Sequence, residues 1–184
     1  MTNNYQIYQS KTVQNNWSDF VDHSHEAYNK ITDLVNSKDS TWNYLHYNIF
    51  VETATSHLYF LLFAELRKYI RDYNRQIGGS DSDMIWMQSW LNFHKSDEVL
   101  DWHGHPWEFH GYISIDPKKS KTIFREWEIY NEIGQVYIGP GSNDDRYHHK
   151  VEVLEPYEGD RITIGFDCTK RQNEVLQSKM IPIL

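Results

Sequence analysis

The spacing of apolar residues changes part-way along the chain, and this change limits the folds that the chain can adopt. Before Gly78-Gly79, apolar residues recur every three or four positions, which is the period of a helix with one buried face. After this point they alternate with polar residues, which is the period of a strand. We therefore expect a helical part over 1–79 and a β-rich part over 84–167.

The two parts can be divided into elements. Helices are predicted over 17–36 and 56–75, with Ser56 as the N-cap of the second helix, whereas the period of 41–52 is ambiguous. Strands are predicted over 84–93, 108–115, 122–130, 135–138, 149–154 and 161–167. Helices followed by many short strands predict one α+β domain over 1–184, with helices packed on a β-sandwich or jelly roll.

Composition excludes several classes of protein. The formal net charge of −8 argues against a general nucleic-acid binder and against a protein that docks on anionic membranes. The longest apolar run, 58–64, is too short to cross a bilayer, and the first residues lack the features of a signal peptide. The single cysteine, Cys168, excludes an internal disulfide and fits a reducing compartment. We therefore expect a cytoplasmic protein.

The histidines provide a candidate metal site. His103 and His105 flank a glycine, and on a strand these two side chains would point to the same side. A third imidazole is available from His149 or His148. Neutral imidazole suits Fe, Zn, Cu and Ni, and three protein ligands leave positions open for catalysis. A His-x-His pair alone is more often an ordinary surface or pocket feature; the downstream cluster favours a metal site.

Other histidines are predicted to have different roles. His110 lies five residues after His105, on the opposite face of an extended segment, so we expect it behind the ligands or at the surface. Five more are expected to be structural: His23, His25, His46, His57 and His94.

Arg161 begins a run in which Arg161, Thr163 and Gly165 share one strand face. A guanidinium beside a hydroxyl can clamp a carboxylate, because Arg donates two parallel hydrogen bonds and Thr adds a third. The alternative is an ordinary surface salt bridge. The position of Arg161, twelve residues after His149, favours the clamp.

Taken in order, these motifs resemble the 2-oxoglutarate/Fe(II)-dependent oxygenases, in particular the small members found in bacteria and in bacteriophages of marine cyanobacteria. The resemblance covers about 86–167. Its pieces are Trp90-Leu-Asn92, His103-Gly-His105-Pro106, the strand from His110 to Ile115, Gly139-Pro-Gly, His149-Lys-Val151, Pro156 and Arg161-Ile-Thr163.

The resemblance implies a double-stranded β-helix with Fe(II) at one mouth of the barrel. His103, His105 and His149 would face the metal, Arg161 would bind the distal carboxylate of 2-oxoglutarate with Thr163 assisting, and Asn92 would join these cofactor-binding residues. The implied activity is hydroxylation with O2 of a substrate that the sequence does not identify. A phage-encoded protein acting in the host cytoplasm is also implied.

The chain departs from the oxygenase pattern at one position. The usual second ligand is a carboxylate, and here it is His105. This departure leaves three alternatives. Three imidazoles hold the iron, a nearby acid (Asp101 or Glu108) supplies the carboxylate ligand, or the site has lost its function. Aromatic residues near the ligands are expected in the pocket or in the core: Trp102, Trp107, Tyr112, Tyr137 and Tyr147.

Two other functions are compatible with the sequence. One is a cupin-like metalloprotein that does not use 2-oxoglutarate, which three histidines would suit and in which Arg161 would have no carboxylate to bind. The other is a non-catalytic jelly-roll protein that binds a ligand or belongs to a virion.

Overall fold

The structure, a computed structural model, describes residues 4–98, 100–141, 144–171 and 179–183. Its helices are α1 (Lys11–Asn15), α2 (Trp17–Val35), α3 (Ile49–Glu52) and α4 (His57–Gln76), with short 3-10 turns η1 (Tyr44–His46) and η2 (Asp145–Tyr147). Its strands are β1 (Gln6–Gln9), β2 (Ile85–His94), β3 (Phe109–Asp116), β4 (Ser120–Phe124), β5 (Glu128–Tyr130), β6 (Gln135–Pro140), β7 (His149–Val153), β8 (Arg161–Thr169) and β9 (Ile181–Ile183).

The two long helices are confirmed, and each has one buried face. In α4 the buried residues follow the expected spacing: Tyr59, Leu62, Leu66, Ile70 and Tyr73. The hydroxyl of Ser56 caps this helix by accepting a hydrogen bond from the backbone of Tyr59. Burying each of these large side chains contributes about 1.5–3 kcal/mol, so the helix is held by packing against the sheet more than by its intrinsic propensity.

The strands form two antiparallel sheets. The large sheet has the order β1-β6-β3-β8-β2-β9, and the small sheet has the order β5-β4-β7. A single antiparallel bridge between His103 and His149 adds a further segment beside β7. From β2 to β8, successive segments pass back and forth between the sheets, with β2, β3, β6 and β8 in one and His103, β4, β5 and β7 in the other. This is a jelly roll, or double-stranded β-helix, and it confirms the expected α+β fold class.

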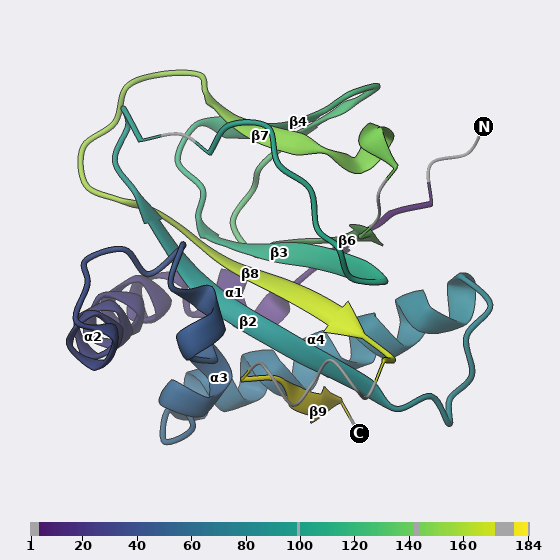
Figure 1. The fold of residues 1–184 in the computed structure, drawn as a ribbon. Helices are drawn as coiled ribbons and strands as arrows, with labels where there is room; N and C mark the ends of the chain where they lie inside the picture. The colour runs from purple at the N-terminus through teal and green to yellow at the C-terminus, as the bar shows by residue number, and fades with distance from the viewer. Residues whose placement is uncertain (1–3, 99, 142–143, 172–178, 184) are drawn as a thin grey trace.

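Helices and small sheet lie on opposite sides of the large sheet (Figure 1). Successive side chains of β8 point to opposite sides of the large sheet, so one set can pack against the helices while the other faces the small sheet. Ile162, Ile164, Phe166 and Cys168 belong to the hydrophobic core that includes the buried faces of α2 and α4. The alternate residues Arg161, Thr163, Gly165 and Asp167 line a cavity on the other side. Within the described residues, no helix is long and apolar enough to cross a membrane.

Four details of the predicted secondary structure are wrong or incomplete. The first part is not wholly helical, because β1 pairs with β6 through main-chain hydrogen bonds at the edge of the large sheet. Segment 122–130 is two strands, because the backbone of Phe124 bonds to that of Trp127 and reverses the chain. The ambiguous segment 41–52 contains η1 and α3, and the late strand β9 was not foreseen.

Candidate metal centre

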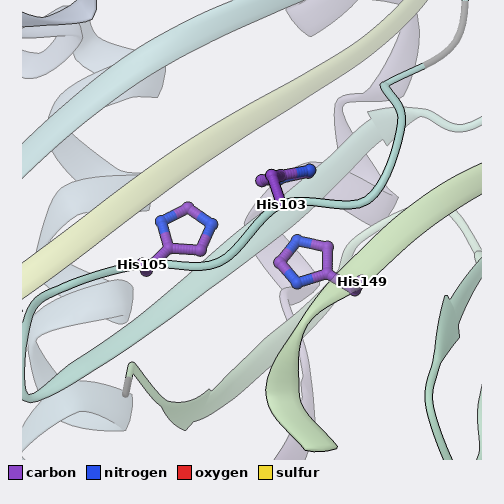
Figure 2. Close-up of side chains that lie close together, drawn as sticks. All are labelled: His103, His105 and His149. Atoms are coloured by element: carbon purple, nitrogen blue, oxygen red, sulfur yellow. The ribbon is translucent and has the colours of Figure 1, made fainter. Parts of the chain in front are cut away.

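Three imidazoles come together between the two sheets (Figure 2). His103 and His105 lie in the connection from β2 to β3, and His149 is the first residue of β7. One nitrogen from each ring lies within 4.8 Å of those of the others. The backbones of His103 and His149 exchange two hydrogen bonds of 3.0 Å, which fixes the spacing of these two residues. The structure therefore brings together the three residues that the sequence singled out.

Each ring is oriented by a contact at Nδ1. His103 Nδ1 is 2.8 Å from the carbonyl oxygen of Asp101, and His149 Nδ1 is 3.2 Å from that of Tyr147. His105 Nδ1 is 2.7 Å from Oδ1 of Asp167. The carbonyl acceptors of His103 and His149 require a proton on Nδ1, so the lone pair of Nε2 in these two rings is left for a metal ion. Metal-binding histidines are commonly oriented in this way.

The charge state of the rings suits metal binding. Burial lowers the pKa of His149 well below its usual value, and the neighbouring His103 and His105 lower it further. The pKa of His103 is lowered mainly by burial, against the opposing effect of its bond to the Asp101 carbonyl. Neutral imidazole is the form that binds metal, and three such donors fit Fe(II) and other first-row ions with positions left open.

The neighbouring histidines are outside the converging group. His148 turns toward solvent, with Nδ1 3.2 Å from Oδ1 of Asp145, and its ring packs on Gly104. His110 is buried, and its ring stacks on that of His105 at 4.2 Å. The segment does not stay extended, because the chain bends at 107–108 before β3 begins, and of the two expected positions His110 takes the one behind a candidate ligand and not the one at the surface. Burial, followed by the proximity of His105, lowers the pKa of His110 well below its usual value.

The two acids considered from the sequence have other partners. Oδ1 of Asp101 accepts a hydrogen bond from the backbone of Trp102, and Glu108 pairs with Arg171 at 3.2 Å. The carboxylate at the site is Asp167, which the sequence analysis missed. A signal for it existed, because Asp167 continues the alternating face that begins with Arg161 and Thr163.

Arg161 is buried, so it does not form the surface salt bridge that was the alternative for it. In the described part of the chain no carboxylate lies within ion-pair distance of its guanidinium, which is 3.3 Å from Nδ1 of His94. Burial lowers the pKa of Arg161, and it also lowers that of His94, to about 4, with a further contribution from Arg161. His94 therefore accepts a hydrogen bond as a neutral ring, which is a more specific role than the structural one expected.

Thr163 and Asn92 accompany Arg161. The amide nitrogen of Asn92 donates to the hydroxyl of Thr163 at 3.2 Å. The amide oxygen of Asn92 is buried and has no hydrogen-bond partner among the described residues. A buried guanidinium without a counter-charge and a buried acceptor without a donor both point to a polar ligand at this end of the site.

The histidine triad and the group of Arg161, Thr163 and Asn92 line the same cavity, which has a volume of about 140 Å³. Its walls include the three histidines, Arg161, Thr163, Asn92 and Asp167. Of the five aromatic residues expected in the pocket or in the core, Tyr112 lines the pocket, and Tyr137 and Tyr147 are buried outside it. Trp102 and Trp107 do neither. Aromatic side chains that the sequence analysis did not select complete the wall: Trp42, Tyr44 and Trp90.

No family model matches the sequence, and no curated protein matches it. Similar solved structures include a cupin-2 domain protein from Shewanella frigidimarina, with 18% identity over 48% of this chain and 74% of that one, and a TM-score of 0.33. A 2OG-Fe(II) oxygenase family oxidoreductase from Burkholderia pseudomallei has 12% identity over 63% and 59%, and a TM-score of 0.45. A full-length Neurospora crassa protein, solved in complex with alpha-KG, has 11% identity over 91% and 74%, and a TM-score of 0.49. At such distances the fold assignment rests on the strand order of this chain.

Proposed function

We propose that this protein is an oxygenase that uses Fe(II) and 2-oxoglutarate to hydroxylate a substrate with O2. One observation carries the proposal: a converging histidine triad and a buried guanidinium without a carboxylate partner in the described residues share one cavity. A dicarboxylate co-substrate suits this cavity, because one carboxylate can bind Arg161 while the other end of the molecule binds the metal at the histidine triad.

The residues of this chain would have separate tasks. His103, His105 and His149 would hold the ion and leave positions for the co-substrate and O2. Arg161 would donate a bidentate pair to the distal carboxylate, and Thr163 would add a hydrogen bond. His94 keeps the guanidinium in place from behind. When bound, the iron supplies the oxidative chemistry, in which 2-oxoglutarate is converted to succinate and CO2.

Arg161 separates this proposal from a cupin-like enzyme without 2-oxoglutarate. A guanidinium without a carboxylate partner in a buried site costs free energy, and a bound anion would offset that cost. A metal site with no anionic co-substrate gives no reason for such an arrangement.

The test is a turnover assay that needs no knowledge of the substrate. Metal-free protein is loaded with Fe(II) and 2-oxoglutarate without oxygen, O2 is admitted, and succinate is measured. We expect slow succinate formation that depends on both iron and protein, and its loss in His103→Ala. Metal binding without 2-oxoglutarate binding would favour the cupin-like enzyme, and failure to bind metal would favour the non-catalytic protein.

A further inference from the structure

A carboxylate lies directly behind one of the three histidines. Oδ1 of Asp167 is 2.7 Å from Nδ1 of His105, and the two side chains are only 3% and 10% exposed. The other two rings direct Nδ1 to neutral main-chain carbonyls, those of Asp101 and Tyr147. The triad is therefore asymmetric, because His105 alone among the three is backed by an acidic side chain.

The position of Asp167 in the fold leaves it few other partners. It lies in β8, near the middle of the large sheet, opposite Gln88 of β2 and His110 of β3. Among the described residues, no Lys or Arg forms an ion pair with it. A buried carboxylate without a charged partner is unfavourable, so a positive charge near its contact with His105 would stabilise it. A divalent ion on the far side of His105 would provide one.

We propose that Asp167 is a positioning residue for the metal: it holds His105 with Nε2 toward the ion and supplies the negative charge that three imidazoles lack. In the oxygenases that this chain resembles, a carboxylate occupies the position of His105 and binds the metal directly. Here the carboxylate nearest the triad, that of Asp167, lies against Nδ1 of His105 and comes from β8. This inference rests on the metal site of the proposed function.

Two physical effects would follow from the contact. Oδ1 of Asp167 has no hydrogen-bond partner among the described residues, although it lies 2.7 Å from Nδ1 of His105. A carboxylate at this distance favours the proton on Nδ1 and would raise the basicity of Nε2, which strengthens its bond to a metal. The negative charge also compensates part of the charge of the ion in a site shielded from water. Loss of such an outer partner typically weakens metal binding by about 10- to 100-fold.

Titration of metal-free protein with Co(II), followed by visible absorption, tests the two effects together. We expect Asp167→Asn, which keeps the shape and removes the charge, to weaken Co(II) binding by about 10- to 100-fold. Asp116→Asn is the matched control, because Asp116 is also buried in the large sheet but pairs with Lys118. Equal Co(II) affinity in wild type and Asp167→Asn would overturn the inference alone, whereas a wild type that binds no Co(II) would overturn the proposed function with it.

A double-mutant cycle separates charge compensation from a structural role. In a His105→Asp background the metal has a direct carboxylate ligand, and Asp167 becomes a like charge beside it. We expect Asp167→Asn to leave Co(II) affinity unchanged or to raise it in that background, which is the reverse of its effect in the native one. Equal weakening in both backgrounds would show that the substitution merely disturbs the fold, and would overturn the inference.

A measurement on the native ligand set is available if the His105→Asp background fails to fold. In Zn(II)-loaded, 15N-labelled protein, the Nδ1 proton of His105 should resonate downfield of those of His103 and His149, because of the three rings only His105 has a carboxylate beside its Nδ1. Asp167→Asn should remove this difference. Three equivalent Nδ1 protons in the wild type would contradict the proposed contact.

Discussion

Arg161 is the residue whose surroundings imply a ligand most strongly. It is 4% exposed, and the polar groups nearest to it are uncharged. We expect Arg161→Ala to weaken 2-oxoglutarate binding by about 10- to 100-fold, since each charge-assisted hydrogen bond contributes about 1.5–3 kcal/mol and each 1.4 kcal/mol is a factor of ten. Calorimetric titration of 2-oxoglutarate into Mn(II)-loaded protein measures this, because Mn(II) prevents turnover.

Arg161→Lys is the informative companion variant. It should recover part of the affinity, because the charge is kept and the planar pair of donors is lost. Metal affinity should change little in both variants. Unchanged 2-oxoglutarate affinity in Arg161→Ala would remove the main reason to prefer this oxygenase over a cupin-like enzyme.

Two adjacent histidines provide a matched pair for the metal site. His149 is buried in the converging group, whereas the side chain of His148 is 34% exposed and faces Asp145. We expect His149→Ala to lose most bound Fe(II) and His148→Ala to keep one ion per chain, as measured by metal analysis after anaerobic loading. His103→Ala should resemble His149→Ala, and the exposed His25→Ala should resemble wild type; full stoichiometry in His103→Ala would refute the assignment.

His94 should make stability depend on pH. Its pKa is lowered from 6.5 to about 4 in the folded protein, so the unfolded chain binds more protons between these values. The free energy of unfolding therefore falls as pH falls from 6.5 toward 4, with a slope of at most about 1.4 kcal/mol per pH unit from this residue. Denaturant unfolding of metal-free protein at pH 7, 6 and 5 should show a smaller slope in His94→Gln, and an unchanged one in the exposed His57→Gln.

At the scale of elements, the hydrophobic period predicted the long helices and most strands, because each has one face in the core. It did not predict β1 or β9, which are three or four residues long and are held at sheet edges by main-chain bonds that do not depend on residue type. The hydrophobic period also predicted one strand where the structure has β4 and β5. The reason is that a tight turn between two strands can preserve the alternation of apolar and polar residues.

The site was predictable where neighbouring positions share a face. The alternation that placed Arg161 beside Thr163 also extends to Asp167. The position of this carboxylate in the site could therefore have been predicted from the same alternation. The packing of His110 against His105 was not, because it depends on a bend that no local period encodes. The cavity residues Trp42 and Tyr44 come from the irregular segment between α2 and α3, and only the tertiary fold brings them to the site.

One glycine is essential to the close packing of β3. Gly111 lies opposite Ile138 of β6 and Phe166 of β8. A Cβ atom there would collide with the carbonyl oxygen of Tyr137 and with the ring of Phe166. Since a main-chain carbonyl in a central sheet cannot move aside, Gly111→Ala should lower the free energy of unfolding by about 1–3 kcal/mol or more. An unchanged midpoint of denaturant unfolding would show that the strands can separate locally.

For the whole molecule, the relevant feature is a large core that the helices share with the large sheet, beside a smaller cluster of Phe124, Ile129 and Tyr137. Phe20 and Ile31 of α2, Leu62 and Leu66 of α4, and the apolar face of β8 belong to one buried cluster. We therefore predict that 1–184 unfolds as one cooperative unit, with coincident transitions by far-ultraviolet circular dichroism and by tryptophan fluorescence. Two separated transitions would mean that the helical layer and the jelly roll are independent.

The main-chain bridge between residues 103 and 149 has a consequence for evolution and design. Its two hydrogen bonds join backbone atoms only, so they hold the two positions in register whatever side chains occupy them. An exchange of either histidine for cysteine or aspartate would change the ligand set while leaving the spacing intact. The barrel thus holds two ligand positions at a fixed spacing. A substitution of one residue at either position can alter the preference for one metal over another while the fold stays the same.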